Sequence, residues 1–228
     1  MKTLMQKLLG AAAIGAAAIG FATTSVAAGG EQQVLVNQSV TTLNNFMRDP
    51  EMTWLQQNIG RAKAVLISPE IVKAGFIIGG SGGRGVLVAK TPEGKWVGPG
   101  FYTLATASVG FQAGLAASEV VTLVMTEKGL NSLLATSVKL GGDASIAAGP
   151  VGAGAKSDIV ADMISFSRSK GVYGGLNLDG TVVTSNNDWD KAYFGKPVLP
   201  PDILVRANVS NKEAAPLLQA VAKAAGGK

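Results

Sequence analysis

Apolar residues recur at helical spacing near the start of the chain. Between residues 31 and 50 they return every three or four positions, as in Val36, Val40, Leu43 and Met47, with Asn and Gln around them. This period predicts an amphipathic helix, and Pro50 marks its end. A second short helix is predicted around residues 54–59.

The pattern then changes to short apolar runs. Residues 64–67 read as a strand, and Ser68 followed by Pro69 reads as the start of a short helix through residue 72, because Ser favours the N-cap and Pro the first helical position.

Glycines and β-branched residues dominate from residue 75 to about residue 185. Strands are predicted at 76–79 and 86–90, joined by a glycine hairpin at 80–85, and at 95–97, 102–107, 111–116 and 120–125. Thr126 is expected to open a helix. Strands follow at 145–148, 159–167 and 172–178, and Asp179-Gly180 predicts a hairpin into 181–184.

Helices return at the end of the chain, around Trp189 and in an Ala-rich segment near Leu217 and Val221. The sequence therefore predicts an α+β fold. Its centre is a glycine-rich, mostly antiparallel β core, a curled sheet or barrel-like, flanked by N- and C-terminal helices.

Residues 1–28 have the organisation of a secretory signal peptide. Lys2 and Lys7 precede an uncharged Ala- and Gly-rich stretch that ends in small residues, which suits cleavage after Ala27 or Ala28. A membrane anchor is the alternative, but the apolar stretch is short and poor in Leu. We expect residues 29–228 to form one exported domain, either free in the periplasm or peripheral on the inner or outer membrane.

The amino-acid composition excludes several kinds of chemistry. The chain has no Cys and no His, which removes thiolate chemistry, disulfides, the usual general base and the commonest transition-metal ligand. We expect no enzyme activity, no metal and no cofactor. Without residues 1–28, 18 basic residues face 15 acidic ones, a net charge of +3. This mild excess does not indicate nucleic-acid binding.

Three motifs resemble known binding sites for a nucleotide, a phosphate or calcium, but the residues around each motif argue against that function. Residues 80–85 match the dinucleotide spacing, but a strand follows where a helix is needed. Residues 149–157 resemble a phosphate loop with its lysine one position late. Asp188 and Asp190 offer calcium ligands, yet the EF-hand spacing is missing, and a solvated turn that caps a helix is the favoured interpretation.

Basic residues at strand ends are the remaining candidates for binding. If several meet at one rim beside aromatic side chains, they suit phosphate-bearing lipid headgroups. The candidates for headgroup contact are Arg61, Lys63, Lys73, Arg84, Lys90 and Lys95, and those for apolar membrane contact are Phe76, Trp96 and Phe101. Each of these bases alone is more often a solvated charge.

Several segments together resemble a known family. They are Ala62-Lys63-Ala64-Val65-Leu66-Ile67, Val72-Lys73-Ala74-Gly75-Phe76, Gly94-Lys95-Trp96 with Pro99, Leu140-Gly141-Gly142-Asp143, Ala148-Gly149-Pro150-Val151-Gly152, Ser167-Arg168-Ser169-Lys170-Gly171, Gly175-Leu176-Asn177-Leu178-Asp179-Gly180, Ala192-Tyr193-Phe194-Gly195 and Asp202-Ile203-Leu204. In this order the chain resembles the SYLF domain over about residues 60–206.

The resemblance implies a compact α+β domain that binds membranes without catalytic residues. In eukaryotic members a basic amphipathic helix before the core is held to recognise phosphoinositides, whereas residues 31–50 here contain Arg48 as their one base. The resulting hypothesis is a protein that binds anionic phospholipids in the bacterial envelope, with no actin partner. The alternatives are an envelope structural or protein-interaction module, with an envelope protein as partner, and a carrier that encloses an acyl chain in the β core.

Overall fold

One curled sheet forms the centre of the protein. The computed structural model describes residues 30–75, 78–109, 114–152, 159–169, 172–173 and 178–226. Neighbouring strands lie in the order β5-β9-β3-β2-β1-β4-β7-β6, and β8 pairs with β7. Pairing is antiparallel except between β6 and β7. The predicted fold class is confirmed.

The four central strands are long and the others short. The strands are β1 (Ala64–Gly75), β2 (Ile78–Lys90), β3 (Trp96–Val109), β4 (Gly114–Val124), β5 (Ser137–Lys139), β6 (Ile146–Ala148), β7 (Met163–Ser169), β8 (Val172–Tyr173) and β9 (Val182–Ser185). The helices are α1 (Gly30–Arg48), α2 (Thr53–Asn58), α3 (Glu127–Leu134), α4 (Asn187–Phe194), α5 (Pro200–Leu204) and α6 (Ala215–Gly226), with short 3-10 turns η1 (Pro50–Met52), η2 (Ile59–Arg61) and η3 (Lys212–Ala214).

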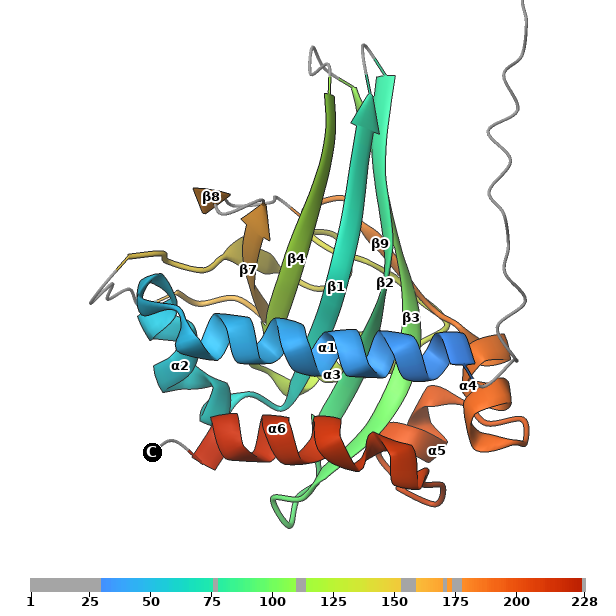
Figure 1. Ribbon diagram of the computed structural model, residues 1–228. Helices are drawn as coiled ribbons and strands as arrows, with labels where there is room; N and C mark the ends of the chain where they lie inside the picture. The colour runs from blue at the N-terminus through green and yellow to red at the C-terminus, as the bar shows by residue number, and fades with distance from the viewer. Residues whose placement is uncertain are drawn as a thin grey trace, which may run out of the picture.

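Helices cover the lower part of one sheet face. Figure 1 shows α1 and α6 running side by side across the long strands, whose upper ends rise well above α1. Side chains of β1 alternate between the two faces, as the pleat requires. Val65 and Ile67 join the core beneath α1 and α6, whereas Leu66 points into a second core with α3 and α5. Burial on both faces explains the continuous apolar run.

The predicted helices at both ends of the chain are confirmed. Thr126 opens α3 as expected, because its Oγ1 accepts the backbone N–H of Gly129 at 3.0 Å. Among the residues that the structure describes, no helix is both long enough and apolar enough to cross a membrane.

The helix predicted at residues 68–72 is wrong. These residues continue β1, and the register with both neighbouring strands shifts between Ile67 and Ile71. Pro69 sits in this irregularity, where a missing backbone donor is tolerated. Pairing on both sides of the strand outweighs the local helix signal of Ser-Pro.

The hairpin predicted at residues 80–85 is wrong too. The glycines lie inside β2 and pair with β1 on one side and β3 on the other. A Cβ at Gly83 would come within 2.3 Å of the carbonyl oxygen of Glu70. Glycine is needed there for a close approach of two strands rather than for a turn.

Two further strand assignments change. The predicted strands at 111–116 and 120–125 meet in one strand, β4, although residues 111–113 lie outside the described residues. The turn at Asp179-Gly180 exists, but it does not join hairpin partners, because β8 pairs with β7 while β9 pairs with β3 and β5.

Candidate functional site

Four of the six candidate bases gather at the lower end of the sheet. Arg61 and Lys63 precede β1, Lys90 ends β2, and Lys95 precedes β3. Lys90 Nζ donates to the carbonyl oxygen of Gly60 at 2.6 Å. Lys63 pairs with Glu127 at 2.9 Å, so part of this positive charge is already compensated within the fold.

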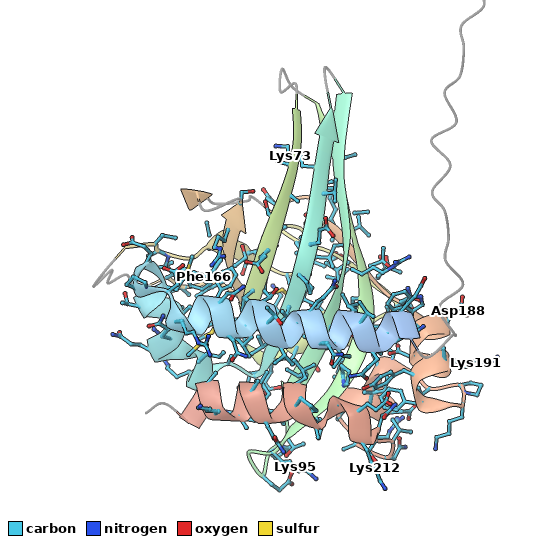
Figure 2. All side chains as sticks on the ribbon, in the orientation of Figure 1. Lys73, Lys95, Phe166, Asp188, Lys191 and Lys212 are labelled. Carbon is cyan, nitrogen blue, oxygen red and sulfur yellow. The ribbon has the colours of Figure 1, made fainter. Side chains whose placement is uncertain are left out.

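The other two bases lie elsewhere. Figure 2 shows Lys73 on the rising part of the sheet and Lys95 at the opposite end of the molecule. Arg84 lies in the middle of β2, where its guanidinium carbon is 4.5 Å from the centre of the Trp189 ring. The structure thus brings four of the six candidate bases to one end of the sheet and places Lys73 and Arg84 apart from them.

Two of the candidate aromatic residues belong to the core. Phe101 is fully buried between Trp189 and Tyr193, with ring centres 5.8 and 5.1 Å away. Trp96 is 6% exposed. This corrects the expectation that they contact a membrane, and we assign them packing roles. Phe76 lies outside the described residues.

The upper ends of the long strands form a distinct surface. We call residues 71–75 of β1, 78–83 of β2, 103–109 of β3 and 114–118 of β4 the sheet extension. Its sequence contains no acidic residue and one base, Lys73. On the side facing α1, the register places Ala117, Val72, Gly82 and Ala105 in one row across the four strands. We call this row the wall, and small uncharged side chains dominate it.

A groove lies where α1 crosses the foot of the sheet extension. It has a volume of about 650 Å³, and its lining includes Val34 of α1, Val72, Gly82 and Ala105 of the wall, and Trp189. Glu31, Glu70 and Arg84 supply its charges. A second groove of about 440 Å³ shares Gln38 and Glu70 with it and reaches Glu119 and Arg168.

Arg84 is turned toward α4. In the described structure its close contact is with Trp189, and it forms no ion pair with Glu70, although the two are cross-strand partners. The groove thus presents a guanidinium and a carboxylate side by side that do not neutralise each other directly.

Asp190 positions the helix that holds Trp189. Its side chain is completely buried, and Oδ1 accepts the backbone N–H of Phe101 at 2.9 Å. Burial raises the pKa of Asp190 to about 7, against the opposing effect of that hydrogen bond. The expected solvated turn is therefore corrected for Asp190, while Asp188 is exposed.

A second buried carboxylate fixes the loops behind the sheet. Asp162 accepts hydrogen bonds from Thr126 Oγ1 at 2.6 Å and from the backbone and hydroxyl of Ser145 at 3.0 and 2.8 Å. The bond from Thr126, with those from Ser145 and Lys128, lowers the pKa of Asp162 far below its ordinary value. No cluster of three or more potential metal ligands occurs among the described residues.

Comparison with known proteins gives the family. The model of the Ysc84 family, described as "Las17-binding protein actin regulator", matches residues 105–224, which is more than half of the chain. The chain belongs to the Ysc84 family. This match confirms the resemblance to the SYLF domain.

Relatives of this Ysc84 domain occur in eukaryotes. The SH3 domain-containing YSC84-like protein 1 of Homo sapiens is 26% identical over 151 residues, covering 64% of this chain and 44% of the human protein. LAS seventeen-binding protein 3 of Saccharomyces cerevisiae is 31% identical over 142 residues, covering 59% of this chain and 31% of the relative. The chain thus spans less than half the length of these curated relatives.

Sequence reasoning missed the groove. Glu31, Glu70 and Trp189 come from three distant segments, and only Arg84 was among the candidate residues. The available signal was the alternation within β1 and β2, which puts Glu70, Val72, Gly82 and Arg84 on one face once both segments are read as strands.

Proposed function

We propose that this Ysc84 domain is a non-enzymatic protein of the bacterial cell envelope that binds anionic phospholipid membranes. The observation that carries the proposal is the sheet extension, which projects from the body without an acidic residue and bears Lys73. This end has no acidic group that an anionic surface would repel, and it has few charged groups that lose water on contact with lipid. The free-energy cost of placing it against an anionic membrane is therefore small.

The orientation follows from the shape. Val72 to Gly75 of β1 spans about 10 Å at 3.3 Å per residue, enough to reach through a headgroup layer. With the sheet extension upright, α1 lies across the strands and so parallel to the membrane plane. The extension end would then contact the lipid.

The lower basic group offers a competing contact surface. Lys95 is exposed there and lies at the opposite end of the protein from Lys73. Both ends cannot lie on one flat membrane at once, so charge reversals at the two positions distinguish the two orientations.

Sedimentation with vesicles tests the proposal. The mature protein is mixed with phosphatidylglycerol or phosphatidylcholine vesicles at low and high salt. We expect recovery on phosphatidylglycerol that falls at high salt. Lys73→Glu should weaken the partition roughly thirtyfold, since a membrane-facing base contributes about 1 kcal/mol and its replacement by an acid removes this attraction and adds a repulsion of similar size. Lys191→Glu on α4 is the control, with the same charge change at an exposed site.

Each outcome is decisive. Loss of binding in Lys95→Glu but not in Lys73→Glu would place the contact at the lower end and overturn the orientation. Equal and negligible recovery on all vesicles would overturn membrane binding itself.

Export is part of the proposal. A signal peptide at residues 1–28 would deliver the domain to the periplasm and separate it from cytosolic actin, with which the family description is concerned. N-terminal sequencing of protein from a periplasmic extract should begin at residue 28 or 29. A full-length chain in the cytosol would contradict export.

Protein binding is the second candidate, because a relative is named as a LAS seventeen-binding protein. Chemical cross-linking in an envelope extract, compared between wild type and Lys73→Glu, tests it. A single cross-linked protein that persists when all lipid is removed by detergent would favour this function over membrane binding.

A further inference from the structure

The groove at the foot of the sheet extension has a chemical character of its own. It combines an apolar wall, one guanidinium and two carboxylates, so it is suited neither to a purely apolar ligand nor to a simple anion. We propose that it binds a phospholipid with a zwitterionic ethanolamine headgroup. The proposal rests on the membrane-binding function above and goes beyond it, because the groove is a second site for one lipid of a different class from the anionic lipids that the surface meets.

Arg84 supplies the phosphate contact. Its side chain is exposed to the groove and is held over the Trp189 ring at 4.5 Å, which orients the guanidinium without neutralising its charge. A planar guanidinium with several donors is the preferred protein partner of a phosphate group.

Glu70 and Glu31 supply the ammonium contact. Glu70 is exposed on β1 directly across from Arg84, so the two side chains leave neighbouring strands about 5 Å apart and on the same face. Glu31 lies on the α1 side of the same groove. A headgroup that carries a phosphate and an adjacent ammonium satisfies both signs at once.

The wall above these charges suits an acyl chain. Val72 is 38% exposed and Val34 is 49% exposed, on opposite sides of the groove. Gly82 leaves space between them, because a Cβ built there contacts only the carbonyl oxygen of Leu104, at 3.7 Å. The row crosses the four strands, so an acyl chain that continues upward from it runs along the strands, toward the membrane in the orientation proposed above.

The groove also suggests a different place for the lipid of the carrier hypothesis, which assumed that the lipid lies inside the β core. Both faces of the lower sheet carry buried side chains of the two cores. The groove on the α1 side is open and is bordered by residues of both cores, among them Leu35 and Leu104. A lipid would be seated on the sheet rather than within it.

Soluble short-chain lipids test the proposal without a membrane. Isothermal titration of the mature protein with dihexanoyl-phosphatidylethanolamine, -phosphatidylcholine and -phosphatidylglycerol, all below their micelle concentrations, compares headgroups on the same chains. We expect the ethanolamine lipid to bind at least fivefold more tightly than the other two. Choline keeps the positive charge but cannot donate hydrogen bonds to the carboxylates.

Three variants test the roles of the carboxylate, the guanidinium and the wall in lipid binding. Glu70→Gln should abolish the preference for ethanolamine over choline, and Arg84→Gln should weaken all three lipids at least fivefold. Gly82→Leu should block binding by filling the wall while leaving the fold intact. Gly142→Leu is its matched control, because Gly142 is exposed in a turn far along the chain and a Cβ there also meets no close contact.

The failures of the two proposals are distinguishable. If wild type binds anionic vesicles but no short-chain lipid, or if Gly82→Leu and Gly142→Leu bind alike, the groove proposal is overturned and membrane binding stands. Equal affinity for ethanolamine and choline lipids overturns the headgroup assignment. If neither vesicles nor short-chain lipids bind, both proposals fail.

Discussion

Asp190 Oδ1 lies 2.9 Å from the backbone nitrogen of Phe101, and this hydrogen bond joins α4 to β3. The carboxyl group is completely buried, and within the described structure its Oδ2 has no hydrogen-bond partner. The contact that positions Trp189 beside the groove therefore depends on a group that is expensive to ionise.

This predicts a pH-dependent stability. The pKa of Asp190 is raised to about 7 in the fold and lies near 4 in the unfolded chain, so the native state holds the proton more tightly. The stabilisation is complete below pH 4 and is lost as the pH rises toward 7, by roughly 1.4 kcal/mol per pH unit.

The measurement is urea unfolding at pH 5 and pH 7 for wild type and Asp190→Asn. Asn keeps an acceptor for the Phe101 N–H and does not ionise. The free energy of unfolding of wild type, relative to the variant, should fall by roughly 2 kcal/mol between these values. Parallel pH profiles for the two proteins would show that Asp190 does not titrate in this range.

Asp162 should behave in the opposite direction. Its pKa is lowered, chiefly by the hydrogen bond from Thr126, so its contribution is present at neutral pH and is lost as the pH falls below about 4. Asp162→Asn should lower the free energy of unfolding at pH 7 by about 2 kcal/mol, because charge-assisted hydrogen bonds to Thr126 and Ser145 are weakened. The exposed Asp188→Asn should change it by less than about 0.5 kcal/mol.

Neighbouring glycines in β2 should respond differently to alanine. A Cβ at Gly83 meets the Glu70 carbonyl oxygen at 2.3 Å, whereas one at Gly82 meets nothing closer than 3.7 Å. We expect Gly83→Ala to destabilise by about 2 kcal/mol or more and Gly82→Ala to be neutral or stabilising by about 0.5 kcal/mol. Thermal unfolding of both variants tests this, and similar melting temperatures would mean that the strands do not approach so closely.

Phe101 should affect stability rather than lipid binding. Replacing this buried ring by Leu removes its edge contacts to Trp189 and Tyr193 and should lower the free energy of unfolding by about 1–2 kcal/mol. Vesicle recovery of the folded variant should equal that of wild type. Selective loss of vesicle binding with unchanged stability would restore Phe101 as a membrane contact.

Local patterns predicted the helices at both ends of the chain and the start of α3. The three- and four-residue spacing in α1 reports one buried face, and Thr126 has the side chain that an N-cap needs. Such features depend on residues a few positions apart, so sequence periodicity captures them. The fold class followed from the same reasoning.

The central strands were harder to predict because the local preferences of their residues differ from the structure that strand pairing imposes on them. Ser68-Pro69 favours a helix start and the glycines of β2 favour a turn, yet pairing with strands on both sides decides both segments. Such pairing joins residues far apart in sequence, and no local propensity reports it.

The candidate site shows the same limit. Exposure of a base can be guessed from its type, but the burial of Phe101 and Asp190 depends on α4 packing across β3. The juxtaposition of Glu31, Glu70 and Trp189 likewise arises from three elements that meet only in the folded protein. Family resemblance pointed to a lipid surface but not to this groove.

The glycines of β2 also set an order for folding. Five of them lie at positions 79, 80, 82, 83 and 85, and each loses more conformational freedom on entering a strand than any other residue does. The lower strands, with large side chains in two cores, have the stronger driving force and should form first, after which the sheet extension closes upward. The end that we propose meets the lipid would be the last to acquire structure. The export proposed above would then deliver a chain that completes its sheet only after its body has formed.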